Sequence, residues 1–170
     1  MTPFETTHLF LLRHAHSSWA VPGERDHSRT LDRKGQAQAE RLAGKLAPHA
    51  EPLRHVVCSS ARRARETLDG IRSALPRSVG VEFKDELYAE GESAYRDAAL
   101  RHLASGATLL IGHNPTIADF AASLLHSDPE GLARLENGYG TACWAAIAVP
   151  LGPGGRPDLA NAWLESWIEP

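Results

Sequence analysis

Cysteine is scarce in this chain. Only Cys58 and Cys143 are present, they form no Cys-x-x-Cys pair, and each lies in a short apolar run, so we expect two buried free thiols. Long apolar runs are missing as well. No window approaches the ~20 consecutive apolar residues of a membrane-spanning helix, and the first residues lack the basic and apolar segments of a signal peptide. These absences favour a cytoplasmic protein without a membrane partner.

An excess of positive charge is also missing. The chain has 18 Lys and Arg against 21 Asp and Glu, which gives a formal net charge of -3 at pH 7. Such a chain has no basic field that would attract nucleic acid, so we expect no nucleic-acid partner. With 42% hydrophobic and 23% charged residues, the composition is that of an ordinary globular domain. We therefore predict a single domain over residues 1–170.

Strand-like and helix-like patterns alternate along the chain. Such alternation predicts a three-layer α/β/α sandwich with a mostly parallel sheet, and a late hairpin with a Gly- and Pro-rich turn adds an antiparallel edge strand. Residues 16–30 are polar and contain Pro22-Gly23, which predicts a long loop. The expected strands are 8–13, 53–58, 80–83, 107–111, 142–149 and 160–167. The first expected helix begins at Asp32 and ends at Pro48, and three more are expected over 61–75, 93–104 and 116–125.

Arginine or histidine follows an apolar strand at three places. These places are Arg13-His14, the run from Ser59 to Arg65 that contains three arginines, and Gly112-His113-Asn114. Because the carboxyl ends of parallel strands meet at one edge of a sheet, we expect the three segments to lie together. Guanidinium groups bind phosphoryl oxygens bidentately, and backbone amides at helix starts add further donors. A lone strand-end histidine is more often structural, but the threefold recurrence favours a phosphoryl-binding site.

Five sequence blocks, together with their order along the chain, resemble the histidine phosphatase superfamily, which is also called phosphoglycerate-mutase-like. Among its members, the chain is most similar to the small SixA-type phosphohistidine phosphatases. A lone Arg-His pair would be a weak signal, whereas five ordered blocks are a strong one. The blocks are Arg13-His14-Ala15-His16-Ser17-Ser18-Trp19, Asp26-His27-Ser28-Arg29-Thr30-Leu31-Asp32 with Gly35, Cys58-Ser59 through Arg63-Ala64-Arg65-Glu66-Thr67, Asp85-Glu86-Leu87-Tyr88, and Ile111-Gly112-His113-Asn114-Pro115.

The resemblance implies a role for each matching residue. His14 would be the nucleophile that forms a covalent phosphohistidine, since a neutral imidazole attacks phosphorus without an added base. Arg13, Arg63 and His113 would hold the phosphoryl oxygens and stabilise the transition state. The family's Ser-x-x-x-Arg-Ala spacing selects Arg63 among the three neighbouring arginines, and Ser17 is a further candidate for phosphate binding. This chemistry needs no metal and no cofactor.

The proton donor for the leaving group is the open part of the assignment. Larger members of the family use a glutamate after the third strand, which makes Glu86 the candidate acid here, with Glu90 or neither glutamate as alternatives. His14 and His16 also have the spacing of a strand chelate for a metal ion. No carboxylate or third histidine has a matching spacing, so we expect no metal site.

Chain length bears on the substrate. Mutases and larger phosphatases of the family have long insertions that form a lid, and this chain is too short for them. An open site suits a phosphohistidine on another protein, which is therefore the leading substrate. The alternatives are an enzyme for small phosphomonoesters, a phosphoglycerate mutase-like enzyme, and an inactive module that binds a phosphorylated ligand.

Overall fold

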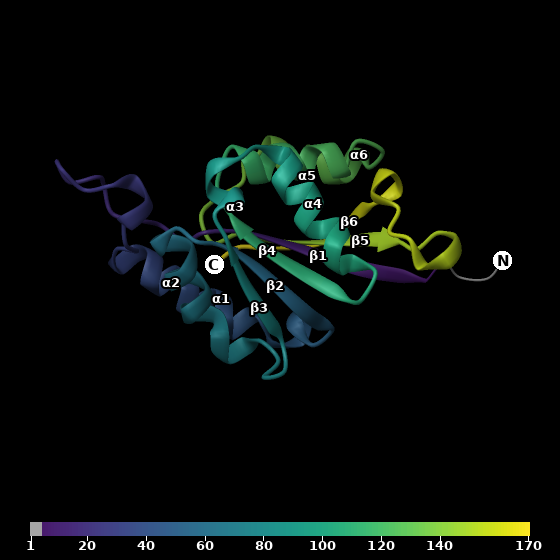
Figure 1. Cartoon of the computed structure of the whole chain (residues 1–170), viewed down its shortest axis with the longest axis horizontal. Coiled ribbons are helices and arrows are strands. Elements are labelled where there is room, and N and C mark those ends of the chain that lie inside the picture. Colours follow the sequence, from purple (N-terminus) through teal and green to yellow (C-terminus); the bar gives the residue numbers. More distant parts are fainter. Residues whose placement is uncertain (1–4) are drawn as a thin grey trace.

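Within residues 5–170, six strands form one mixed sheet with helices on both faces (Figure 1). The computed structural model describes residues 5–170; residues 1–4, which the sequence places in the same domain, lie outside the described residues. The strand order is β3-β2-β4-β1-β5-β6, in which β3, β2, β4 and β1 are parallel, whereas β5 and β6 are antiparallel to their neighbours. The strands are β1 (Thr6–Arg13), β2 (Leu53–Ser59), β3 (Gly80–Lys84), β4 (Ala107–Gly112), β5 (Trp144–Pro150) and β6 (Trp163–Ile168).

Alternating side chains of the central strands build two hydrophobic cores. Along β1, Leu9 and Leu11 face one core, and Phe10 and Leu12 face the other. Helices α4, α5 and α6 cover the first core and α1 and α2 cover the second, which confirms the three-layer α/β/α sandwich. The helices are α1 (Arg33–Ala50), α2 (Arg62–Ile71), α3 (Glu86–Ala89), α4 (Glu92–Leu103), α5 (Thr116–Leu124) and α6 (Pro129–Glu136).

Helices α1, α3 and α6 differ from the sequence prediction, since α3 was not among the expected helices. Helix α1 continues through Pro48 to Ala50, because a proline this near the helix end removes only one backbone bond and the fully buried Ala50 holds the last turn. Helix α6 was not predicted. Its signals are local: Asp128 caps the helix by accepting a hydrogen bond from Gly131 N–H, and a proline occupies the first turn.

Other features of the described chain bear on the class of protein. Both cysteines are free and buried, as expected from their apolar surroundings. Within residues 5–170, no helix combines the length and the apolar character needed to cross a bilayer.

Strand order brings three strand ends to one edge of the sheet. Because β2, β4 and β1 are adjacent and parallel, their carboxyl ends lie side by side. Pairing between β1 and β4 continues beyond the strand itself, since His14 N–H donates to the Gly112 carbonyl at 3.0 Å. Each of the three segments singled out by arginine or histidine therefore starts from this edge.

Candidate active site

His14 is buried at this edge, with its ring held by the backbone of the next residue. Its side chain is 8% exposed, and its Nδ1 lies 2.7 Å from the Ala15 carbonyl oxygen. A carbonyl only accepts, so Nδ1 carries the proton and the lone pair is on Nε2. The turn is anchored in turn by Thr67, whose hydroxyl accepts from Ala15 N–H at 2.9 Å. The geometry therefore presents His14 Nε2 as an unprotonated nitrogen.

Arg63 lies directly against this nitrogen. Its Nε donates to His14 Nε2 at 3.3 Å, and its side chain is almost fully buried at the start of α2. The two terminal nitrogens donate to Asp26, one to the backbone carbonyl at 2.8 Å and one to the carboxylate at 3.1 Å. These three bonds fix the plane of the guanidinium group beside the histidine.

The carboxylate of Asp26 is held in its ionised form. It accepts from Arg63, from Arg29 Nε at 2.8 Å and from the Tyr88 hydroxyl at 2.9 Å. Burial opposes ionisation, but the Tyr88 hydrogen bond and the two arginine charges outweigh it and lower the pKa of Asp26 to about 2. Asp26 is thus a fixed negative charge that orients Arg63 over the whole neutral pH range.

His113 completes the cluster from the end of β4. Its ring centroid lies 5.0 Å from that of His14, and its Nε2 is 2.8 Å from the hydroxyl oxygen of Ser59. Burial, followed by the nearby charges of His14 and Arg63, lowers the pKa of His113 to about 3. Its Nδ1 is buried without a hydrogen-bond partner among the described residues. The cluster therefore holds a neutral imidazole with one unused nitrogen.

Glycine is required at the turn into His113. A Cβ on Gly112 would lie 2.0 Å from the Tyr95 hydroxyl, so no other residue fits without displacing that ring. The same hydroxyl accepts from His113 N–H at 3.0 Å and donates to the Leu87 carbonyl at 2.9 Å. Tyr95, which lies in α4, thereby fixes the backbone of His113.

Arg13 reaches the edge by a different route. Its NH1 donates to the Tyr139 carbonyl at 2.8 Å, while its Nε is buried without a partner among the described residues. The described hydrogen bonds include none between Arg13 and His14, yet the charge of Arg13 contributes to a lowered His14 pKa. The structure thus brings His14, Arg63 and His113 into direct contact and places Arg13 beside them.

Burial is the largest cause of the low basicity of His14. It lowers the pKa of His14 to about 4; the hydrogen bond to Ala15 opposes this shift, and the charges of Arg63, Arg13 and Arg29 add to it. At neutral pH the imidazole is therefore uncharged, and its Nε2 keeps a lone pair, which accepts the hydrogen bond from Arg63.

Glu86 and Glu90 lie outside this cluster of contacts. Neither side chain forms a hydrogen bond or ion pair within the described residues to His14, Arg63 or His113. Both instead line a cavity of about 270 Å³ together with polar and charged residues of β3 and α4, including Glu82, Lys84, Asp97, Arg101 and His102.

Ser17 and His16 form hydrogen bonds to residues next to the cluster. The Ser17 hydroxyl accepts from Arg29 NH1 at 3.1 Å. His16 Nδ1 lies 2.6 Å from the carboxylate of Asp32, which caps α1 by accepting from Gly35 N–H at 2.9 Å. Within residues 5–170, no group of three or more His, Cys, Asp or Glu side chains is arranged to hold a metal ion.

Several residues around the cluster received no role from the sequence. Tyr88 contacts Asp26 and packs its ring 5.6 Å from that of His113. Ser60 links two loops, since its hydroxyl donates to Asp85 and lies 2.9 Å from His27 Nε2. Asp26, His27, Asp85 and Tyr88 all stand in the blocks that carried the resemblance, and that membership was the only signal for them.

Acid is expected to weaken the fold through His14 and His113. Their pKa values of about 4 and about 3 lie below the ordinary 6.5, so between pH 7 and pH 5 the unfolded chain takes up protons that the folded protein does not. This stabilisation is complete above pH 6.5 and decreases as the pH falls. Each histidine should cost about 2 kcal/mol in the free energy of unfolding over this interval, measured by urea denaturation.

A pair of variants isolates the effect of one histidine. His113→Gln should reduce the loss between pH 7 and pH 5 by about 2 kcal/mol. The exposed His126 provides the control, because His126→Gln should lose as much stability as the wild type. Equal acid sensitivity in His113→Gln and wild type would contradict the assignment.

Comparison with known proteins gives a consistent set of relatives. The family model of the histidine phosphatase superfamily (branch 1) matches residues 9–90. An uncharacterised chloroplastic protein of Arabidopsis thaliana is 31% identical over 164 residues, which cover 86% of this chain and 73% of the relative. The matched segment includes His14 and Arg63 but ends before His113.

Two solved structures extend the likeness over nearly the whole chain. A candidate phosphohistidine phosphatase SixA from Agrobacterium tumefaciens is 28% identical, with a TM-score of 0.79 over 96% of this chain and 99% of that chain. A candidate phosphohistidine phosphatase SixA from Nakamurella multipartitia is 30% identical, with a TM-score of 0.78 over 99% and 98%. The segment that contains His113 is therefore included in the shared architecture.

Proposed function

Because this chain belongs to the histidine phosphatase superfamily (branch 1), we propose that it is a phosphatase in which His14 Nε2 accepts the phosphoryl group of the substrate. The observation that carries the proposal is the state of His14: its Nδ1–H is tied to the Ala15 carbonyl, and its unprotonated Nε2 faces Arg63. The family and its SixA-type structural relatives support phosphatase activity.

The reaction divides into two transfers at phosphorus. In the first, the Nε2 lone pair of His14 forms a bond to phosphorus while the bond to the leaving group breaks. Nδ1 keeps its proton, which it donates in a hydrogen bond to the Ala15 carbonyl, so the phosphorylated ring is an imidazolium. In the second, water attacks phosphorus, the P–N bond breaks and neutral His14 is restored, with the water protons passing to phosphate and solvent.

The neighbouring side chains stabilise the negative charge of the phosphoryl group. Arg63 is already in contact with Nε2, and Arg13 adds a second guanidinium at the same edge. His113 is uncharged, and its unpartnered Nδ1 is the atom that hydrogen-bonds a phosphoryl oxygen. When phosphorus binds Nε2, the Nε–H of Arg63 is released from that nitrogen and donates to a phosphoryl oxygen, and donors held this close stabilise the transition state. The proposal gives no step to Glu86 or Glu90.

We place a phosphohistidine on another protein first among the substrates. Its leaving group, once protonated by solvent, departs as neutral imidazole and so needs little acid help from the enzyme. Between β3 and β4 the described chain contains only α3 and α4, which leaves no long insertion to form a lid. Relatives described as phosphohistidine phosphatases support the same choice.

A substrate screen tests this proposal. Purified protein should release phosphate from a histidine-phosphorylated protein with a kcat/KM at least ~10-fold above that for small phosphomonoesters, and a coupled assay with phosphoglycerate should show no mutase activity. Faster turnover of small phosphomonoesters would replace the leading substrate by that alternative. Binding of phosphorylated ligands without any turnover would identify a binding module and refute the phosphatase.

A further inference from the structure

The loop between β1 and α1 carries an exposed apolar tip, which comprises residues 19–22. Trp19 is 88% exposed and Val21 is 60% exposed, the two highest values among the exposed large hydrophobic side chains of residues 5–170. A tryptophan in water forgoes the burial of roughly 150–250 Å² that aromatic side chains contribute to cores and interfaces. Exposed apolar surface of this kind marks a place where another molecule binds.

Hydrogen bonds hold the base of this loop in place. Ser18 N–H donates to the Thr30 carbonyl at 3.1 Å, and Arg29 NH1 donates to the Ser18 carbonyl at 2.8 Å. After the tip, Glu24 N–H donates to the Val21 carbonyl at 2.9 Å and closes a turn. The tip therefore extends from a base whose two sides are bonded to each other.

Hydrogen bonds also connect the base of the loop to the cluster of His14, Arg63 and His113. Arg29 pairs with Asp26 at 2.8 Å, Asp26 accepts from Arg63 at 3.1 Å, and Arg63 contacts His14. Trp19 follows His14 by five residues, which limits the separation of the two Cα atoms to about 17 Å. The position of the tip is thus tied to that of the candidate nucleophile.

A protein substrate would meet this tip on its way to His14. From the phosphorus of a phosphohistidine to the Cα of its own residue is only about 7 Å, so the surface that carries it must come close to the sheet edge. In Figure 1 this loop, drawn in purple, extends away from the rest of the ribbon on the side where β1, β2 and β4 end. Free phosphohistidine has no such surface.

We propose that the apolar tip binds the surface of the phosphorylated protein next to its phosphohistidine, with Trp19 as the central contact. This inference rests on the proposed phosphatase function and adds the way in which a protein substrate is distinguished from a small one. The tip is apolar and its two charged neighbours, Glu24 and Arg25, cancel, so the matching surface is an apolar patch. A single buried tryptophan commonly dominates the binding energy of such a contact.

Two substrates with the same leaving group separate binding from chemistry. A globular protein phosphorylated on histidine with phosphoramidate and free phosphohistidine are each assayed for phosphate release. In Trp19→Ala, the ratio of kcat/KM for the phosphoprotein to kcat/KM for free phosphohistidine should fall about 10-fold or more. Trp19→Phe should retain most of the ratio because it keeps an aromatic ring.

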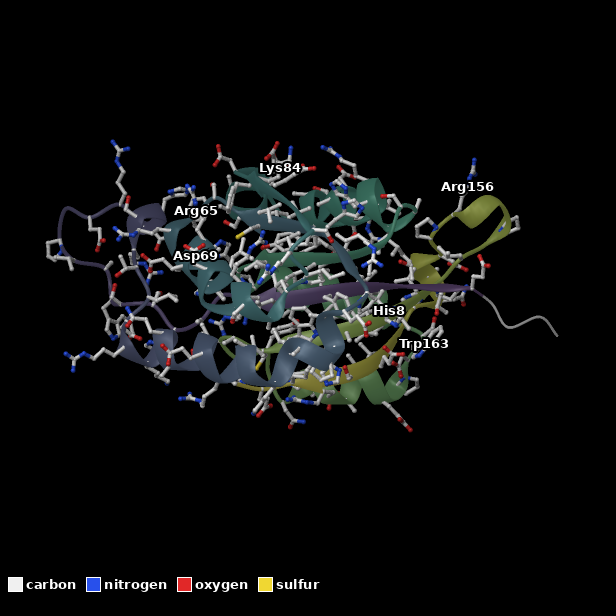
Figure 2. All side chains as sticks on the ribbon, turned by 90° about the horizontal axis from the view of Figure 1, so that it is seen from below. His8, Arg65, Asp69, Lys84, Arg156 and Trp163 are labelled. Atoms are coloured by element: carbon white, nitrogen blue, oxygen red, sulfur yellow. The ribbon has the colours of Figure 1, made fainter. Side chains whose placement is uncertain are left out.

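Trp163 supplies the matched control. It is 40% exposed and lies beside His8, whereas Arg65 of α2 lies toward the other end of the molecule (Figure 2). Trp163 pairs with Ala148, which also pairs with His8, so it belongs to the part of the sheet where β1 begins. Trp163→Ala should therefore leave the ratio of the two kcat/KM values at its wild-type level.

The possible outcomes separate this inference from the function on which it rests. If the wild type hydrolyses neither substrate and no phosphomonoester, the phosphatase proposal fails. If it hydrolyses both and Trp19→Ala leaves the ratio at the wild-type value, or lowers both activities equally, the docking role of the tip is refuted and the phosphatase stands. Light scattering that shows a wild-type dimer and a monomeric Trp19→Ala would assign the tip to self-association instead.

Discussion

Replacing His14 with alanine is expected to abolish phosphate release, with a fall in kcat/KM of at least ~10³-fold. The variant lacks the nitrogen that forms the bond to phosphorus, and none of its neighbours presents an equivalent lone pair. His113 is close, but its Nε2 is engaged with Ser59 and its Nδ1 is the atom proposed to hold a phosphoryl oxygen. Phosphate release from wild type and variant, measured with the same phosphohistidine protein, gives the comparison.

The covalent intermediate provides an independent readout. Wild-type protein mixed briefly with a phosphoryl donor and quenched at high pH should carry one acid-labile phosphate on the peptide that contains His14, and His14→Ala should carry none. His16→Asn is the control, because it keeps a donor for Asp32 and should still be labelled at His14. Activity in His14→Ala within 10-fold of the wild type, or label on His16, would refute the mechanism.

Local sequence signals were sufficient for the strands that position the site. The alternation of Leu9 and Leu11 with Phe10 and Leu12 was readable as a strand, and its end at Arg13 follows from the polar residues after it. The resemblance to the family's Ser-x-x-x-Arg-Ala motif selected Arg63, and the structure places that arginine against His14 while Arg62 pairs with Glu66 on the surface. The strand depends on neighbours in the chain, which is why one sequence reveals it, whereas the choice of Arg63 needed the family motif.

Contacts between distant segments were beyond the same reasoning. Asp26 meets Arg63 across 37 residues and Tyr88 across 62, and no periodic pattern records such a pairing. Arg13 depends on the backbone carbonyl of Tyr139, an atom that every residue possesses. Side-chain partners at a sheet edge are set by how the loops cross it, and this is a property of the whole fold.

The proton donor stays a prediction, with Glu86 as the candidate because larger members of the family use a glutamate after the third strand. At the start of α3, Asp85 contacts Ser60 and Tyr88 contacts Asp26. The glutamate itself lines a cavity shared with β3 and α4. A four-residue helix was enough to redistribute these side chains, and its presence was invisible in the hydrophobic pattern.

Replacing Arg63 with lysine is expected to lower kcat/KM by about 10²–10³-fold although the positive charge is kept. Arg63 uses its Nε toward His14 and its two terminal nitrogens toward Asp26, and a single ammonium group cannot make all three contacts. The transition state thereby loses a preorganised donor. Removing one such hydrogen-bonding group typically lowers the rate by about 10²–10³-fold. Steady-state kinetics with phosphohistidine protein measure it.

A neighbouring arginine distinguishes this role from a general effect of charge. Arg62 is exposed and pairs with Glu66, so Arg62→Gln removes a positive charge one residue away from Arg63 and should keep nearly full activity. The charge of Arg63 also helps to lower the pKa of His14, so Arg63→Gln should shift the acid limb of the residual activity to higher pH. If Arg62→Gln lost as much activity as Arg63→Lys, or if the acid limb of Arg63→Gln stayed in place, the guanidinium beside His14 would have a structural role only, and the phosphoryl group would have to be held chiefly by Arg13 and His113.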